Sequence, residues 1–255
     1  NVVVGDEAGT ALTTGDANVA VGYQALSTED AHGTAVAVGF QALNALNAGV
    51  DSYNTAVGTQ AGVLVTTGTQ NTLIGGLAGD ALTSSVGNVA VGYLSLSAAT
   101  TADLNTAIGH RALTTNILSD RNVALGYAAL STHNLSSNAD GYNVGIGYNA
   151  GGAVTTGTQN TLIGGLAGDA ITTAPNNTAV GYASLTSNTT GFSNSALGQG
   201  SLFSNTTGSN NTAVGNGALD NNTTASNNTA IGANALDANT TASNNTAIGY
   251  ASLES

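Results

Sequence analysis

A five-residue phrase, Asn-Thr/Val-Ala-Val/Ile-Gly with small variations, recurs fifteen times along the 255 residues of this chain. Twelve of the fourteen steps between successive starts are 17 residues long, and the other two are 19 and 21. The starts are Asn1, Asn18, Ala35, Asn54, Asn71, Asn88, Asn105, Asn122, Asn143, Asn160, Asn177, Asn194, Asn211, Asn228 and Asn245. A fixed short period with β-forming residues at its centre is typical of a solenoid of stacked coils. The period predicts an all-β parallel β-solenoid of about 15 coils, continuous as one domain over residues 1–255.

The composition argues against several classes of function. The chain has no Cys. It has two Lys and Arg residues in total against fourteen Asp and Glu residues, and its net charge is therefore −12. Without Cys there is no disulfide framework, and with so few cations we expect no binding to nucleic acid. No apolar run approaches the roughly 20 residues that cross a bilayer. Neither terminal repeat resembles a polar cap, so we expect a segment of a longer fibre.

Two positions of the repeat, numbered from its opening Asn, are predicted to shape each coil. Position 5 is Gly in all fifteen repeats, and position 1 is Asn in all but the repeat that begins at Ala35. We expect a short strand at positions 2–4, followed by a Gly that permits positive φ or a close backbone approach. The Asn residues can form turns and stacked amide ladders. These structural positions include Asn18, Gly22, Asn71, Gly75, Asn122, Gly126, Asn177, Gly181, Asn228 and Gly232.

Positions 9 and 12 compensate each other in side-chain size. Position 9 is Leu in ten repeats and Gly in five, and the five Gly repeats all carry an apolar residue at position 12. The Gly-to-apolar pairs are Gly9 with Leu12, Gly62 with Val65, Gly79 with Leu82, Gly151 with Val154 and Gly168 with Ile171. A close-packed interior explains the exchange, because a lost Leu leaves a costly cavity. One repeat has both Leu43 and Leu46, and its two-residue insertion is expected to turn one of them elsewhere.

The predicted strand is small or apolar on both of its alternating faces. Positions 2 and 4 share one face, and position 3, usually Ala, lies on the other. Strands of this kind are usually buried on both sides. One face can line the coil interior, and in a chain without helices the other face is most simply covered by further copies of the chain. We therefore expect a parallel homo-oligomer.

The repeat resembles the head domains of trimeric autotransporter adhesins of the Yersinia adhesin type. The matching residues are Asn176 to Gly181, with the small residue Ser184, and their counterparts in the other repeats. The resemblance implies a left-handed parallel β-roll, three chains side by side, and an adhesive surface. Similar repeats occur in bacteriophage tail-fibre shafts. The period here is longer than the family's, which is nearer fourteen, and we recognise no counterpart of the family's neck, stalk or membrane anchor within these 255 residues.

Few side chains are candidates for catalysis or for metal binding. His32, His110 and His133 occupy unrelated positions of the repeat, and we expect them to be solvated or to replace an aromatic residue. Arg111 and Arg121 are expected to pair with Asp120 and Asp103. Asp220 and Asp237 share position 10 of adjacent coils, where they are either solvated turn carboxylates or oxygen ligands for Ca²⁺. We expect no catalytic residue and no cofactor.

Two further columns of side chains have alternative interpretations. Position 6 is aromatic in seven repeats, at Tyr23, Phe40, Tyr93, Tyr127, Tyr148, Tyr182 and Tyr250. These rings can stack on sugars or pack at an interface between subunits, and we favour the interface. Thr pairs recur at positions 13 and 14, where a hydroxyl ladder in a turn is favoured over an ice-binding array, because adjacent Thr side chains point in opposite directions.

The sequence is best interpreted as a non-enzymatic extracellular fibre segment that forms the head or shaft of an adhesin. A rigid, homotrimeric rod of this kind offers a multivalent attachment surface, with a host-cell surface or a glycan receptor as a partner. The alternatives are a bacteriophage tail-fibre shaft, a structural self-assembling filament, and an ice- or carbohydrate-binding solenoid. The location expected is extracellular, on a cell surface or in a virion fibre.

Overall fold

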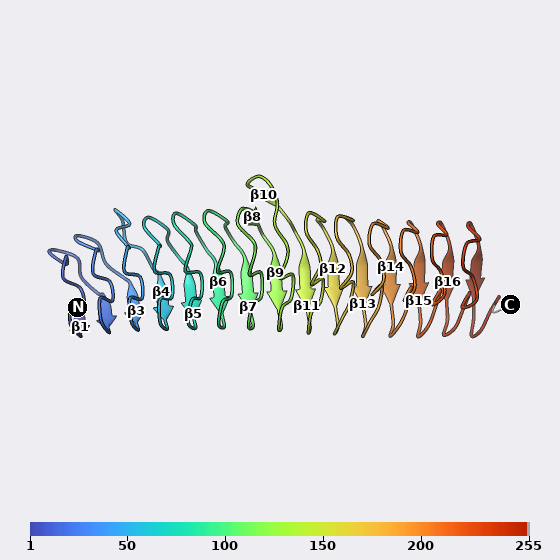
Figure 1. Ribbon diagram of the computed structural model, residues 1–255, viewed down its shortest axis with the longest axis horizontal. Coiled ribbons are helices and arrows are strands. Elements are labelled where there is room, and N and C mark those ends of the chain that lie inside the picture. Colours follow the sequence, from blue (N-terminus) through green and yellow to red (C-terminus); the bar gives the residue numbers. More distant parts are fainter. Residues whose placement is uncertain (254–255) are drawn as a thin grey trace. The chain divides into compact units, whose positions relative to one another are not determined.

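A computed structural model of the chain describes residues 1–253 and shows an all-β parallel β-solenoid of about fifteen turns (Figure 1). Residues 1–253 include no helix, and hence none that could span a membrane. The chain divides into two compact units. The first holds residues 1–122 and 134–140, and the second holds residues 123–133 and the chain from residue 141 onward. The fold class and the repeat length predicted from the sequence are confirmed.

In the first unit, seven three-residue strands pair in parallel in the order of the chain. They are β1 (Val2–Val4), β2 (Val19–Val21), β3 (Val36–Val38), β4 (Thr55–Val57), β5 (Thr72–Ile74), β6 (Val89–Val91) and β7 (Thr106–Ile108). A short second pair, β8 (Ser119–Asp120) and β10 (Ala139–Asp140), is also parallel. β10 lies in the 21-residue repeat, which has four more residues than the regular repeat, and it lies beside β8 in Figure 1.

The second unit repeats the arrangement. Its strands are β9 (Val123–Leu125), β11 (Val144–Ile146), β12 (Thr161–Ile163), β13 (Thr178–Val180), β14 (Ser195–Leu197), β15 (Thr212–Val214), β16 (Thr229–Ile231) and β17 (Thr246–Ile248). Each strand pairs with the same repeat positions of the next, as Thr178 does with Ser195. Equal repeat positions therefore form columns along each unit, so that one side chain per coil meets its equivalents above and below.

Position 5 forms a column in which the backbones of successive coils touch. Every glycine of this column has φ between +123° and +140°, a region that L-residues with a side chain rarely adopt. A Cβ atom on Gly181 would lie 2.5 Å from the carbonyl oxygen of Gly198 in the next coil. The invariant Gly thus provides both the positive φ and the close backbone approach that the sequence predicts.

Position 1 forms a buried ladder of Asn side chains. The Nδ2 group of Asn177 donates to the carbonyl of Gly191, 14 residues later in the same coil, at 3.0 Å. Its Oδ1 accepts the backbone N–H of Asn194, the first residue of the next coil, also at 3.0 Å. From Asn54 to Asn228, each position-1 Asn is fully buried, so each amide is satisfied only when the coil is closed and the next coil is stacked in register.

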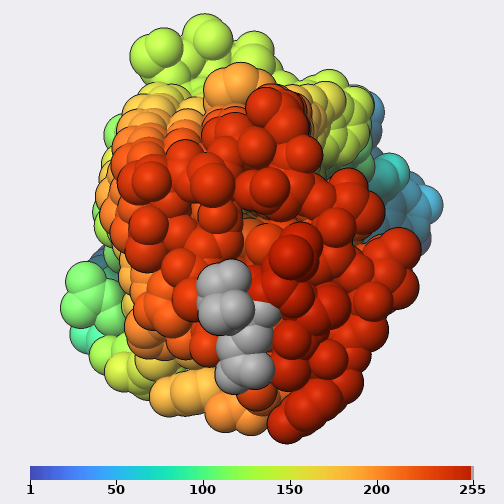
Figure 2. Space-filling model, turned by 90° about the vertical axis from the view of Figure 1, so that its right-hand side faces the viewer, coloured from blue at the N-terminus to red at the C-terminus, as the bar shows by residue number. Residues whose placement is uncertain are grey.

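The core is filled from three repeat positions and from neighbouring coils. A Cβ atom on Gly151 would lie 3.3 Å from Cγ2 of Val154, its position-12 partner, which agrees with the exchange between positions 9 and 12. The same atom would also lie 2.6 Å from Leu162, at position 3 of the next coil, and 2.8 Å from Leu130 of the coil before. Side chains from both adjacent coils, as well as from the same coil, therefore fill the space beside a position-9 Gly. Figure 2 views the second unit from its last coils, drawn in red.

One expectation about the core is wrong. Leu43 and Leu46 belong to the 19-residue repeat, and both are fully buried. The two-residue insertion therefore does not turn either side chain outward. Gly62, at position 9 of the next coil, leaves room for this bulk, since a Cβ atom there would lie 3.0 Å from Cδ2 of Leu43. The volume of the core side chains is therefore balanced between adjacent coils rather than within one coil.

Replacing Gly181 with Ala is predicted to lower the free energy of unfolding by at least about 2 kcal/mol, because a strained φ and a backbone clash act together. Gly200→Ala is the matched control. Gly200 has φ of +64°, and a Cβ atom added there would meet no other atom within 4 Å. Ala183 occupies the same repeat position with φ of +52°. The control should cost less than about 1 kcal/mol. Chemical denaturation of both variants measures the difference, and equal losses would contradict the role assigned to position 5.

Candidate functional site

The side of the strands that faces away from the core carries a row of apolar side chains, which we call the outer strand face. It consists of position 4 of each coil, which is Val, Ile or Leu throughout. In β13, Ala179 is buried while Val180 is exposed, so the strand alternates between the core and the surface. Exposure on this face is 36–42% at Val57, Ile74, Leu125, Val180, Leu197 and Ile231. One strand face lines the interior, as predicted, and the apolar opposite face is open in the single chain.

The position-6 aromatic residues are also exposed, and several stack on their neighbours. The ring centroids of Tyr23 and Phe40 are 5.5 Å apart, and those of Tyr127 and Tyr148 are 5.4 Å apart with an interplanar angle of 10°. The exposure of these four residues ranges from 41% at Tyr23 to 60% at Tyr148. Because stacking covers one face of each ring, these pairs leave mainly edges and a single face for any other contact. The remaining predicted aromatics, Tyr93, Tyr182 and Tyr250, are exposed as well.

The Thr column is a hydroxyl ladder in a turn, as favoured from the sequence. The hydroxyl of Thr189 donates to the carbonyl of Thr206 at 3.0 Å, and that of Thr206 donates to the carbonyl of Thr223 at 3.1 Å. The same hydrogen bond to the next coil is donated by four other position-13 residues, Thr66, Thr155, Thr172 and Thr223. These hydroxyls are engaged in joining coils to each other.

Position 12 carries a second buried amide ladder that sequence reasoning missed. Asn205 donates from Nδ2 to Oδ1 of Asn188 at 2.8 Å, and Asn222 donates to Asn205 at the same distance. Each of these amides is buried, and Asn205 also donates to the carbonyl of Gly208 at 2.9 Å. The sequence showed only that this position is polar in most of the repeats that have Leu at position 9. A repeated Asn at one interior position was the signal that could have revealed the ladder.

The predicted calcium candidates, Asp220 and Asp237, interact electrostatically across adjacent coils. Burial raises the pKa of Asp220, and the charge of Asp237 adds to the rise. Oδ1 of Asp237 accepts a 3.5 Å hydrogen bond from the side chain of Asn221. The two carboxylates are thus neighbours, as the repeat positions predict, while calcium binding by them stays a prediction.

One ion pair has a partner that the sequence did not predict. Arg121 forms an ion pair with Asp140, and it also interacts electrostatically with the expected Asp120. The parallel pairing of β8 with β10 places Asp140 beside Asp120, within reach of Arg121. Burial raises the pKa of Asp120, and the nearby Asp103 and Asp140 add to this effect. The four extra residues of the 21-residue repeat could not be placed from the repeat period, which is why this partner was missed.

The three His residues have three different environments. His110 stacks on Tyr93 with ring centroids 5.6 Å apart, as expected of an aromatic replacement. His133 is fully buried at interior position 12, so the expectation of a solvated or aromatic-replacing ring is wrong there. Burial lowers the pKa of His133 to about 4, against the opposing effect of a hydrogen bond with the backbone of Thr155.

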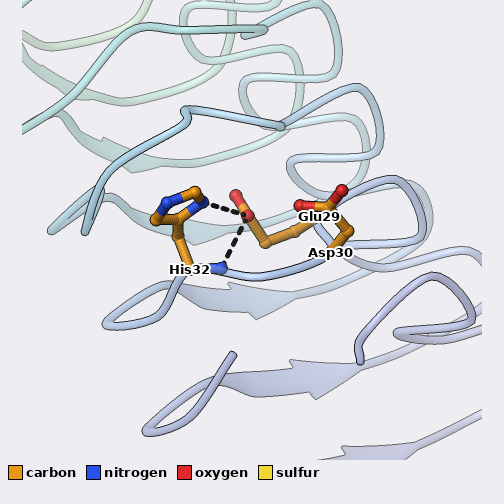
Figure 3. A group of neighbouring side chains, drawn as sticks. All are labelled: Glu29, Asp30 and His32. Carbon is orange, nitrogen blue, oxygen red and sulfur yellow. Dashed lines mark hydrogen bonds and ion pairs between the residues drawn. The ribbon is translucent and has the colours of Figure 1, made fainter. Parts of the chain in front are cut away.

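The third histidine, His32, lies in a turn with Glu29 and Asp30 (Figure 3). One ligand atom from each residue lies within 4.8 Å of the other two. Oε1 of Glu29 lies 3.8 Å from Nδ1 of His32 and accepts the backbone N–H of the same residue at 3.3 Å. Sequence reasoning missed this group because it compared His residues only with each other. The signal was a Glu at position 12 followed within three residues by Asp and His.

His133→Asn is predicted to flatten the pH dependence of stability between pH 6.5 and 4. The folded state holds His133 neutral, so its contribution is complete above the unfolded pKa near 6.5 and is lost as pH falls toward about 4. The wild-type chain should therefore lose about 3 kcal/mol more than the variant over this interval. Asn is the residue at this position in several other coils, such as Asn188. Urea unfolding at a series of pH values tests this, and parallel curves for the two proteins would contradict it.

Comparisons of the chain with protein-family models and with curated proteins found no match in either case.

Proposed function

We propose that this chain is a segment of a non-enzymatic extracellular fibre in which three copies associate side by side through the outer strand face. The fibre acts as the head or shaft of an adhesin and presents a rigid, multivalent attachment surface. Avidity arises because weak contacts repeat along the rod and across its copies. The surface of a host cell, or a glycan on it, is the proposed partner.

The observation that carries the proposal is the apolar row at position 4. Val, Ile or Leu occupies this position in every coil, and no coil replaces it with a charged residue. An apolar row that recurs at a fixed spacing forms a continuous patch within each unit, and patches of that kind mark interaction surfaces. Because all copies carry the same row, parallel association would place the position-4 side chains of one copy against those of the next at every coil.

The flanking column supports the same assembly. The position-6 rings follow directly after the position-5 Gly, and stacked pairs such as Tyr127 and Tyr148 keep apolar edges exposed. Aromatic residues are enriched in the centre of protein interfaces, which is buried once the partners associate. They favour packing between subunits over stacking on sugars, since neighbouring rings already cover one face of each other.

The resemblance to trimeric autotransporter adhesin heads supports the trimer, the left-handed coil and the extracellular location. The alternative is a bacteriophage tail-fibre shaft or a purely structural filament, built on the same outer strand face. An ice- or carbohydrate-binding solenoid is weaker, because the Thr hydroxyls at position 13 are engaged in bonds between coils.

The test is the mass of the particle in solution. Light scattering is predicted to give three times the 24.7 kDa chain mass. The double variant Val180→Glu and Ile231→Glu should give a single-chain mass with an unchanged circular dichroism spectrum, because both side chains lie on the outer strand face and outside the core.

Leu64→Glu is the matched control, since Leu64 is an apolar residue with 52% exposure that lies outside the strands. It should leave the mass at three chains. A single-chain mass for the wild type at tens of micromolar would refute the proposal. A broad distribution of masses above three chains would contradict the trimer and favour the structural filament.

A further inference from the structure

The turn at residues 29–32 brings together a nitrogen and two carboxylate groups in the second coil. We propose that Glu29, Asp30 and His32 form a binding site for one divalent transition-metal ion, with Zn²⁺ as the best match. The ion stiffens the turn at the point where the next coil meets it, through the hydrogen bond from Ala48 N–H to Glu29. The proposal is independent of the fibre assembly and of any receptor.

Glu29 occupies a position that points into the coil. It is at repeat position 12, where other coils have Asn, His or an apolar residue, and it is only 1% exposed. A buried carboxylate is costly unless a cation compensates its charge. The chain has only two Lys or Arg residues, and these are Arg111 and Arg121, four or more coils away along the sequence. No Lys or Arg side chain is therefore near Glu29 in the sequence to compensate its charge, and a bound cation would do so.

His32 directs an unoccupied ring nitrogen at this carboxylate. Its Nδ1 is buried without a hydrogen-bond partner and lies 3.8 Å from Oε1 of Glu29, too far for a direct hydrogen bond (Figure 3). The Glu29 oxygens are held by long backbone bonds only, from His32 N–H at 3.3 Å and from Ala48 N–H at 3.4 Å. A carboxylate oxygen has two lone-pair sites, so both oxygens keep one for a metal ion.

The spacing and the chemistry of the three ligands fit a small transition-metal ion. Ligand atoms bound about 2.1 Å from a tetrahedral Zn²⁺ lie about 3.4 Å from one another. The 3.8 Å between Glu29 and His32 is close to that edge, and Asp30 lies within 4.8 Å of both. An imidazole nitrogen with carboxylate oxygens suits Zn²⁺, whereas Ca²⁺ and Mg²⁺ prefer oxygen ligands alone. Three protein ligands leave a fourth position for water.

The location explains why a stiffened turn is useful there. The position-1 Asn ladder is interrupted at Ala35, the one repeat without Asn, directly after this turn. Asn18 is the last amide before the gap, and it donates to the carbonyl of His32 at 3.0 Å. Backbone groups of the next coil meet the same turn, because Ala48 N–H donates to Glu29. A metal ion held by this turn stiffens the junction where the amide ladder is broken.

Calorimetric titration of the metal-free chain with ZnCl₂ tests the proposal. We expect saturable binding of one ion per chain, and a rise in melting temperature with Zn²⁺. Glu29→Asn and His32→Gln should each weaken binding at least tenfold and abolish the shift in melting temperature. Glu29→Asn should fold, because Asn116 at the same repeat position donates to the carbonyl of Ser119 at 2.8 Å.

His110→Gln is the matched control, because this His lies on the aromatic column and outside the turn. It should bind Zn²⁺ like the wild type, and CaCl₂ or MgCl₂ should bind more weakly than ZnCl₂. The proposal is overturned if no saturable Zn²⁺ binding occurs, or if folded Glu29→Asn and His32→Gln retain wild-type affinity.

Discussion

The buried amide at position 1 is the interaction on which the rest of the solenoid depends. In most coils the Asn closes its own coil through Nδ2 and receives the first backbone N–H of the next coil through Oδ1, as Asn177 does with Gly191 and Asn194. An unsatisfied amide in this position would cost about 1–3 kcal/mol. Slipping the stack by one residue would leave the whole column unsatisfied. The ladder therefore fixes the register of the coils, and with it the columns at every other position.

The remaining columns follow from that register. Backbone contact at Gly181 and Gly198 is possible only because equal positions lie directly above one another. The same alignment lets Leu130 and Leu162 fill the space beside Gly151 from the coils on either side, so the core is shared between coils. On the opposite side of the strands, alignment gathers Val180 and its equivalents into one apolar row. A surface that repeats at each coil suits association along its length.

The repeat period was sufficient to predict the coil, the strand and the roles of Gly and Asn, because these depend on residues at one position in every repeat. Features that depend on single departures from the period were missed. The burial of both Leu43 and Leu46 depends on a Gly in the next coil, and the partner of Arg121 depends on where a four-residue insertion folds. The turn with Glu29 and His32 is a third such departure, since its contacts come from the path of the turn and not from a column.

Hydrogen–deuterium exchange at the position-1 backbone amides tests the ladder most directly. The N–H groups of Asn160, Asn177, Asn194 and Asn211 each donate to the Asn of the preceding coil. The account predicts that they exchange only through global unfolding, and so rank among the slowest amides of the chain. Exchange as fast as that of exposed turn amides under the same conditions would show that the ladder does not hold the coils together.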